Sequence, residues 1–150
     1  MNKNEIYVSR EIKGLGHNNA AALIKRAALM ALKEENKDNC IISVLLTDDE
    51  GILEVNRKFR NVDSVTDVLS FPMGDIEIET GKELLGDVLI NIERCELQGL
   101  EYGHGFNHEI MYLTVHSVLH LLGYDHVDEG EMKKEMRSKE KVIMGEYLDE

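Results

Sequence analysis

The sequence predicts an α+β fold in which helices cover one small mixed β-sheet. Helix-like and strand-like apolar patterns follow one another along the 150 residues, with no internal repeat. There is a single proline, Pro72, and no Pro- or Ser-rich stretch that could serve as a linker. Apolar residues make up 43% and charged residues 31%, which is the balance of a globular chain. We therefore expect residues 1–150 to form one domain, as chains of this length usually do.

The first half of the chain contains two expected strands and two expected helices. A strand is indicated around Tyr7, and the alanine- and leucine-rich residues 18–32 predict a helix. Residues 40–47, CIISVLLT, form a short β-branched apolar run that is typical of a buried strand. The acidic residues and glycine at 48–51 indicate a turn, after which a shorter helix extends to Phe59.

Two strands and one helix are expected in the middle of the chain. Residues 68–71 predict a strand that ends at Pro72, because proline lacks the N–H group that a sheet uses. Residues 85–91 predict the next strand. Helical spacing follows at 92–100, and we expect it to break at Gly99.

The last third is expected to be helical apart from one loop. A helix begins at about Asn107 and ends at Gly123, since glycine suits the left-handed conformation that follows many helices. A final helix over 129–144 mixes acidic and basic residues at a spacing of four, which predicts a solvated face. A surface for a macromolecular partner is the alternative for that helix.

Net charge, apolar runs and cysteine usage limit the function classes. The net charge is −12, with 29 acidic against 17 basic residues, which disfavours broad coating of nucleic acid but not a local basic groove. No apolar run approaches the ~18 residues that cross a bilayer, and the N-terminus lacks the layout of a signal peptide. We therefore expect a cytoplasmic protein without a membrane partner, in which Cys40 and Cys95 are small core residues.

Three of the six histidines lie within residues 116–126, HSVLHLLGYDH. His116 and His120 are four residues apart on a predicted helix, so their rings share one face, about 6 Å apart at Cβ. Gly123 ends that helix and lets the chain return, which delivers His126 to the same ion. Three neutral imidazoles leave one or two positions open for water, as in catalytic zinc sites. The segment predicts a hydrolytic metal centre, although imidazole also suits nickel, copper or iron.

Two other interpretations of the histidines are weaker. The spacing is that of the metzincin proteases, HExxHxxGxxH, but Ser117 occupies the position where those enzymes need glutamate as general base. A serine hydroxyl cannot accept the proton of water near pH 7. His104 and His108 are also four apart, but the glycines at 103 and 105 disfavour a helix there, and with it a second metal site.

Three segments resemble the YbeY endoribonucleases, which are also called ribosomal RNA maturation factors. HSVLHLLGYDH resembles the signature HGxLHLxGYDH and departs from it only in Ser117 for glycine. EVNRKFRNVDSVTDVLSFP resembles LNxxYRxxDxPTDVLSFP, and LLGDVLIN resembles the family's LGDIxI strand. The resemblance extends in order from about residue 40 to the C-terminus.

The resemblance implies a zincin-like fold whose metal site lies on a helix of the C-terminal half and on the loop that follows it. It implies one zinc ion on His116, His120 and His126, and cleavage of single-stranded RNA in ribosomal RNA maturation and ribosome quality control. The expected partners are ribosomal RNA and ribosomal particles, and DNA is not expected. It also implies that Arg60 acts at the phosphate, which suits the two-pronged guanidinium.

Several points stay open at the level of sequence. Arg57 and Lys58 are candidates for a basic strip beside Arg60, or else the exposed side of a short helix. Asp67, in the segment TDVLSF, either anchors its loop against the metal site or makes a turn. No residue stands out as a general acid. The alternative functions are a non-enzymatic ribosome-associated factor with a structural metal and, less favoured, a metalloprotease.

Overall fold

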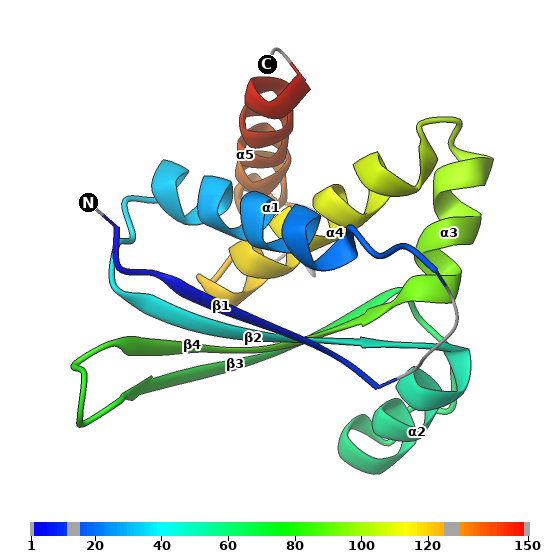
Figure 1. Ribbon diagram of the computed structural model, residues 1–150, viewed down its shortest axis with the longest axis horizontal. Coiled ribbons are helices and arrows are strands. Elements are labelled where there is room, and N and C mark those ends of the chain that lie inside the picture. Colours follow the sequence, from blue (N-terminus) through cyan, green and yellow to red (C-terminus); the bar gives the residue numbers. More distant parts are fainter. Residues whose placement is uncertain (1, 12–15, 125–129, 149–150) are drawn as a thin grey trace.

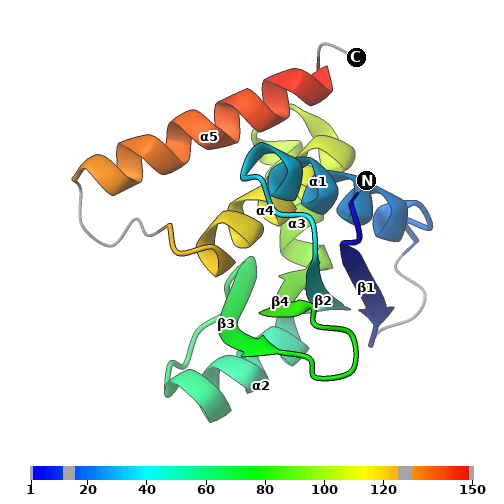
Figure 2. The ribbon, with the colours of Figure 1, turned by 90° about the vertical axis from the view of Figure 1, so that its left-hand side faces the viewer.

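The computed structural model describes residues 2–11, 16–124 and 130–148, and the side chains of these residues up to 145. It confirms the predicted α+β class, with strands and helices alternating along the first part of the chain (Figures 1 and 2). The elements in chain order are β1 Glu5–Arg10, α1 Ala20–Glu34, β2 Cys40–Thr47, α2 Asp49–Arg60, β3 Val68–Ile76, β4 Glu83–Asn91, α3 Ile92–Glu101, α4 Gly105–Leu121 and α5 Glu131–Leu148.

The sheet has the strand order β1-β2-β4-β3. β1 and β4 both pair in parallel with β2, and β3 pairs with β4 as an antiparallel hairpin. The central strand β2 carries the apolar run that the sequence predicts as buried, and Ile42 of β2 and Ile90 of the neighbouring β4 are fully buried. The sheet is therefore mixed, as expected, with β1 and β3 at its edges.

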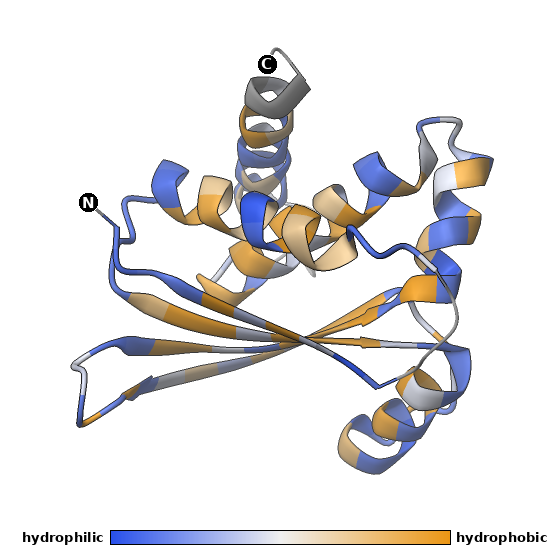
Figure 3. Ribbon diagram, in the orientation of Figure 1, coloured by the Kyte–Doolittle hydropathy of each residue, from blue (hydrophilic) through white to orange (hydrophobic). Residues whose placement is uncertain are grey.

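Helices lie on both sides of the sheet (Figure 1). α1 and α4 cross above it, and α2 packs against β2 and β4 from below. α1 approaches α4 closely because small buried residues, Ala27, Ala28 and Ala31, lie along one side of it. α4 also contacts α3, α5 and β3. Most of the buried residues of α4 are apolar, and hydrophobic colour recurs along its ribbon (Figure 3). This central helix carries the first two histidines of the predicted metal centre.

β3 does not end at Pro72, so that prediction was wrong. The strand continues to Ile76, and Pro72 pairs with Gly86 next to an irregularity in the ladder. The strand tolerates the proline because β3 lies at the edge of the sheet. The backbone nitrogen of Pro72, which lacks a hydrogen, can there face away from the neighbouring strand.

Two glycines lie inside helices where the sequence predicted breaks. Gly99 lies within α3 and does not break it. A Cβ at this position would lie only 2.6 Å from the carbonyl oxygen of Gly105, so the absence of a side chain allows α3 to pack on the start of α4. Residues 48–51 are not a turn. Asp48 is the N-cap of α2 and accepts a hydrogen bond from the Gly51 amide at 2.8 Å, so the helix begins at Asp49.

The final helix is not solvated on all sides. Met136, Glu140, Ile143 and Met144 are buried at spacings of three and four, which gives α5 an inward stripe that contacts α4 and α1. Cys40 and Cys95 are both buried and unpaired, as expected. Among the described residues, no helix is long and apolar enough to cross a membrane.

Candidate active site

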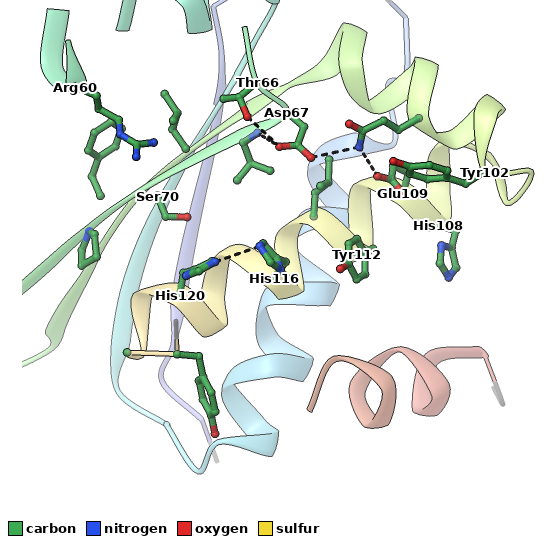
Figure 4. A pocket seen from close by; sticks show the side chains of 18 of the residues that line it. Arg60, Thr66, Asp67, Ser70, Tyr102, His108, Glu109, Tyr112, His116 and His120 are labelled. Carbon is green, nitrogen blue, oxygen red and sulfur yellow. Dashed lines mark hydrogen bonds between the residues drawn. The ribbon is translucent and has the colours of Figure 1, made fainter. Parts of the chain in front are cut away.

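A groove of about 1220 Å³ opens between α4 on one side and β3 with the end of α2 on the other (Figure 4). Its walls come from four elements and the loops beside them, so residues far apart in the sequence meet there. Polar and aromatic lining residues include Phe59, Arg60, Thr66, Asp67, Ser70, Gln98, Tyr102, His104, His108, Glu109, Tyr112, His116, His120 and Tyr124.

His116 and His120 enter the groove from adjacent turns of α4 (Figure 4). Their Nε2 atoms face each other at 3.2 Å, and their rings are nearly perpendicular, at 78°. Two imidazole nitrogens at that distance need either a proton or a cation between them. Two nitrogen ligands of a tetrahedral ion with bonds of ~2.05 Å lie about 3.3 Å apart. The pair therefore fits two corners of a zinc-type site.

The third expected ligand, His126, lies outside the described residues. Among the residues that the structure does describe, no group of three or more His, Cys, Asp or Glu side chains is placed to hold a metal ion. The described chain does show how α4 ends. Gly123 has a φ of +107°, and the Tyr124 amide donates back to the carbonyl of Leu119 at 3.1 Å. Gly123 thus ends α4 as predicted and keeps the start of the next loop against the groove.

A buried carboxylate supports His116 from behind. Glu140 on α5 is only 7% exposed, and its Oε2 lies 2.5 Å from Nδ1 of His116. The Tyr112 hydroxyl donates to the other carboxylate oxygen at 3.2 Å. An ionised carboxylate can only accept, so Nδ1 of His116 carries the proton and Nε2 presents its lone pair to the groove. Burial and the charge of Glu140 raise the pKa of Tyr112, which keeps this hydroxyl a donor.

Arg60 reaches the groove because α2 ends at that residue. Asn61 adopts a left-handed conformation, with φ of 56°, and the Val62 amide bonds to the carbonyl of Asn56 at 3.1 Å. The Asn56 side chain is buried and donates to the carbonyl of Ser64 at 2.9 Å, which fixes the loop after the helix. The guanidinium then reaches into the groove from the side opposite the histidines (Figure 4).

The other two basic candidates lie outside the lining of the groove. Arg57 is exposed, and its Nε donates to Asp63 at 2.5 Å. Lys58 is also exposed, with its ammonium 5.5 Å from the centre of the Phe59 ring. Arg60 is thus the one lysine or arginine among the described residues of the groove wall.

Asp67 anchors its loop. One carboxylate oxygen accepts from the Val68 amide at 2.8 Å and from the Thr66 hydroxyl at 3.3 Å. The other accepts from Gln98 on α3, also at 3.3 Å (Figure 4). The buried Asn91 adds a bond to the carbonyl of Thr66 at 3.1 Å. Asp67 therefore ties its loop to α3 through Gln98, and an anchor against the metal site stays a prediction.

Ser117 is fully buried and does not line the groove. Its hydroxyl oxygen has no hydrogen-bond partner among the described residues. It therefore lies on the core side of α4, where it cannot act on a water at the histidines. Position 117 therefore supplies no general base to the groove.

Sequence reasoning missed the supporting residues of the site. Glu140 looked like one charge among many on α5, although the spacing of its apolar neighbours could have marked it as inward-facing. Glu109 is equally buried, at 1% exposure, and binds His104 and Gln98. No local pattern in the sequence joins Glu109 to Gln98, because their contact depends on how α3 packs on α4.

Comparisons with known proteins agree with this picture. A family model described as Endoribonuclease YbeY matches residues 6–148. Among curated relatives, the Endoribonuclease YbeY of Clostridium kluyveri is 44% identical, covering 76% of this chain and 80% of that protein. The Endoribonuclease YbeY of Acetivibrio thermocellus is 41% identical, covering 81% and 83%. The solution structure of TM1509 from Thermotoga maritima is similar over 96% of this chain and 92% of that one, with a TM-score of 0.62 and 26% identity.

Proposed function

The chain belongs to the YbeY family of endoribonucleases, and on that premise we propose that its groove hydrolyses single-stranded RNA with one divalent metal ion on His116, His120 and His126. The observation that carries the metal proposal is the pair of Nε2 atoms facing each other at 3.2 Å. The protonated Nδ1 of His116 against Glu140 supports it, because metal-binding histidines usually donate their second N–H to such a partner. Zinc is the ion that three imidazoles most commonly hold.

A zinc-type ion held by these histidines would supply a water of lowered pKa, toward ~7, and a Lewis acid for a phosphoryl oxygen. The remaining steps belong to residues of the chain. Glu140 and Tyr112 hold His116 in one tautomer and orientation. Arg60 faces the histidines across the groove, where its guanidinium can hold two oxygens of the scissile phosphate and offset the charge that develops there.

An RNA substrate fits the distribution of charge. The net charge of −12 opposes wrapping of nucleic acid around the whole surface, so recognition is confined to the groove. One arginine opposite the metal ligands suits one phosphate at the reaction centre. We infer that an unpaired strand enters the groove, because an unpaired strand can splay its bases onto the walls.

Ribosomal RNA as the substrate, ribosomal particles as the partner and the cytoplasm as the compartment are further parts of this proposal. They rest on family membership and on no single contact in the structure. Co-sedimentation of the purified protein with ribosomal particles, in the parent and in His120→Ala, tests the association separately from cleavage. We expect both proteins to co-sediment, since the substitution removes one imidazole inside the groove and leaves the outer surface intact. Absence of both from the particle fractions would contradict ribosome association.

Cleavage of a labelled, unstructured RNA by zinc-loaded protein tests the reaction. His120→Ala should abolish cleavage while the circular dichroism spectrum is retained, and His17→Ala, outside the groove, should cut like the parent. Arg60→Ala should slow cleavage by about 10²–10³-fold, the usual cost of losing a donor at developing charge. Lys25→Ala is its matched control, since it removes one exposed positive charge from α1. Cleavage that survives both His120→Ala and a chelator would refute the proposal.

A further inference from the structure

The groove continues well past the histidine pair, along α4 toward its N-terminus (Figure 4). His108 lies at that far end, with Tyr112 between it and His116. Eight residues of α-helix separate His108 from His116, which corresponds to about 12 Å. At this distance His108 is too far from the histidine pair to act on the phosphate bound there. The distance corresponds to about four stacked nucleotides or fewer, at ~3.4 Å each. The far end therefore lies within reach of the same RNA strand.

Three rings form a continuous wall at this end. Tyr102, at the end of α3, lies 5.7 Å from His104 between ring centres, and His104 lies 4.1 Å from His108. Tyr102 is 63% exposed, and His104 is also exposed, so ring surface faces the solvent at the mouth of the groove. Aromatic and histidine rings of this kind are the surfaces on which proteins stack unpaired bases.

A buried hydrogen bond holds the middle ring of the three, His104, in place. The carboxylate of Glu109 is 1% exposed, with Oε1 at 2.7 Å from Nε2 of His104. Its Oε2 accepts from Gln98 at 2.7 Å, and Gln98 also donates to Asp67 at 3.3 Å. The wall is thus tied to α3, α4 and the loop before β3. A rigid wall of this kind loses little conformational entropy when a base binds.

The charges at this end favour a base over a phosphate. Arg60, the one lysine or arginine of the described groove wall, lies across the groove from the histidine pair and away from the rings. The carboxylate of Glu109 lies against His104 and opposes a second anion, and Asp67 is linked to Glu109 through Gln98. Burial and the neighbouring His104 lower the pKa of His108, so that ring is neutral near pH 7. An uncharged planar group is the ligand that these surroundings suit.

We propose that Tyr102, His104 and His108 form a base-binding subsite that takes one unpaired base of the RNA, up to about four nucleotides from the phosphate held at the histidine pair. The inference rests on the proposed function, because it assumes an RNA strand in the groove. It adds a physical cause for single-strand preference, since a base inside a duplex cannot leave its stack to reach these rings.

Binding measured without metal separates the subsite from catalysis. The probe is a fluorescein-labelled, unstructured oligoribonucleotide of about twelve nucleotides, titrated with protein in EDTA and followed by anisotropy. Tyr102→Ala should weaken binding by about 5- to 150-fold, the factor that corresponds to one stacking contact of ~1–3 kcal/mol. Tyr102→Phe keeps the ring and should bind within about twofold of the parent. Leu100→Ala is the matched control, since Leu100 is exposed on the same helix but outside the groove wall.

A series of probes, each lacking one base, identifies the nucleotide. Removal of the base at one position should weaken binding to the parent protein about as much as Tyr102→Ala weakens binding of the intact probe. The two losses of affinity should not add when the variant binds that probe. The subsite would be refuted if the losses of affinity were additive at every position, or if Tyr102→Ala bound the probe as well as Leu100→Ala does. Metal-dependent cleavage by the parent would then still support the proposed function. A parent protein that neither binds nor cuts the probe would instead overturn the proposed function, and the subsite with it.

Discussion

Replacing Glu140 with glutamine tests how His116, a ligand of the proposed metal site, is held. The substitution keeps the size of the side chain and a carbonyl oxygen that can accept from Nδ1, but it removes the negative charge. In the parent that charge is buried, at 7% exposure, and lies 2.5 Å from the imidazole. Hydrogen bonds with one charged partner are roughly twice as strong as neutral ones, so His116 becomes a poorer metal ligand in the variant.

Loss of such a supporting carboxylate typically weakens metal binding by about 10- to 100-fold, or about 1.4–2.7 kcal/mol. The position of Glu140 favours the upper part of that range, because water scarcely reaches its carboxylate and cannot replace the lost charge. Zinc affinity is measured by competition of the metal-free protein with a chromophoric chelator. Urea unfolding of the same metal-free samples verifies that folded proteins are compared.

Glu135→Gln is the control for this experiment, since Glu135 is an exposed glutamate on the same helix. It should bind zinc within about twofold of the parent. If Glu140→Gln also binds zinc within twofold of the parent, then the carboxylate does not support the ligand and the reasoning from the 2.5 Å contact is refuted.

Three further predictions concern stability. Ser117→Ala removes a buried hydroxyl without a partner among the described residues, so it should raise the free energy of unfolding by about 1 kcal/mol in urea titrations, and a loss would show that the hydroxyl is bonded. Gly99→Ala places a Cβ 2.6 Å from the Gly105 carbonyl oxygen and should lower that free energy by about 1–3 kcal/mol, whereas an unchanged value would show that α3 and α4 separate without cost. The pKa of His108 is lowered by burial and by His104. Below pH ~6.5 the unfolded chain therefore binds a proton at this residue more readily than the folded chain does, and the free energy of unfolding decreases as the pH is lowered. His108→Gln should make that fall shallower in metal-free protein, and identical slopes would contradict the assignment.

The sequence predicted those parts of the molecule that depend on local pattern. The strand at residues 40–47 has the predicted bounds, since a β-branched apolar run between polar residues has few other solutions. His116 and His120 meet because helical spacing alone places them on one face. Gly123 ends α4 because only glycine takes its positive φ at little cost.

The remaining features depend on tertiary contacts that local pattern does not contain. Pro72 is tolerated within β3 because the strand is at an edge, which follows from strand order and not from the residue itself. Gly99 looked like a helix breaker, but it is where the backbone of α4 approaches α3. Glu140 is 24 residues away from His116 in the sequence, and only the packing of α5 on α4 brings them together.

Metal stoichiometry tests the central claim most directly. Elemental analysis of the purified protein, after saturation with zinc and removal of free metal, should give about one ion per chain. His116→Ala, His120→Ala and His126→Ala should each fall to near zero while remaining folded, because two imidazoles alone hold zinc too weakly to survive the separation. A His126→Ala variant that keeps a full equivalent of zinc would contradict a site built from these three histidines.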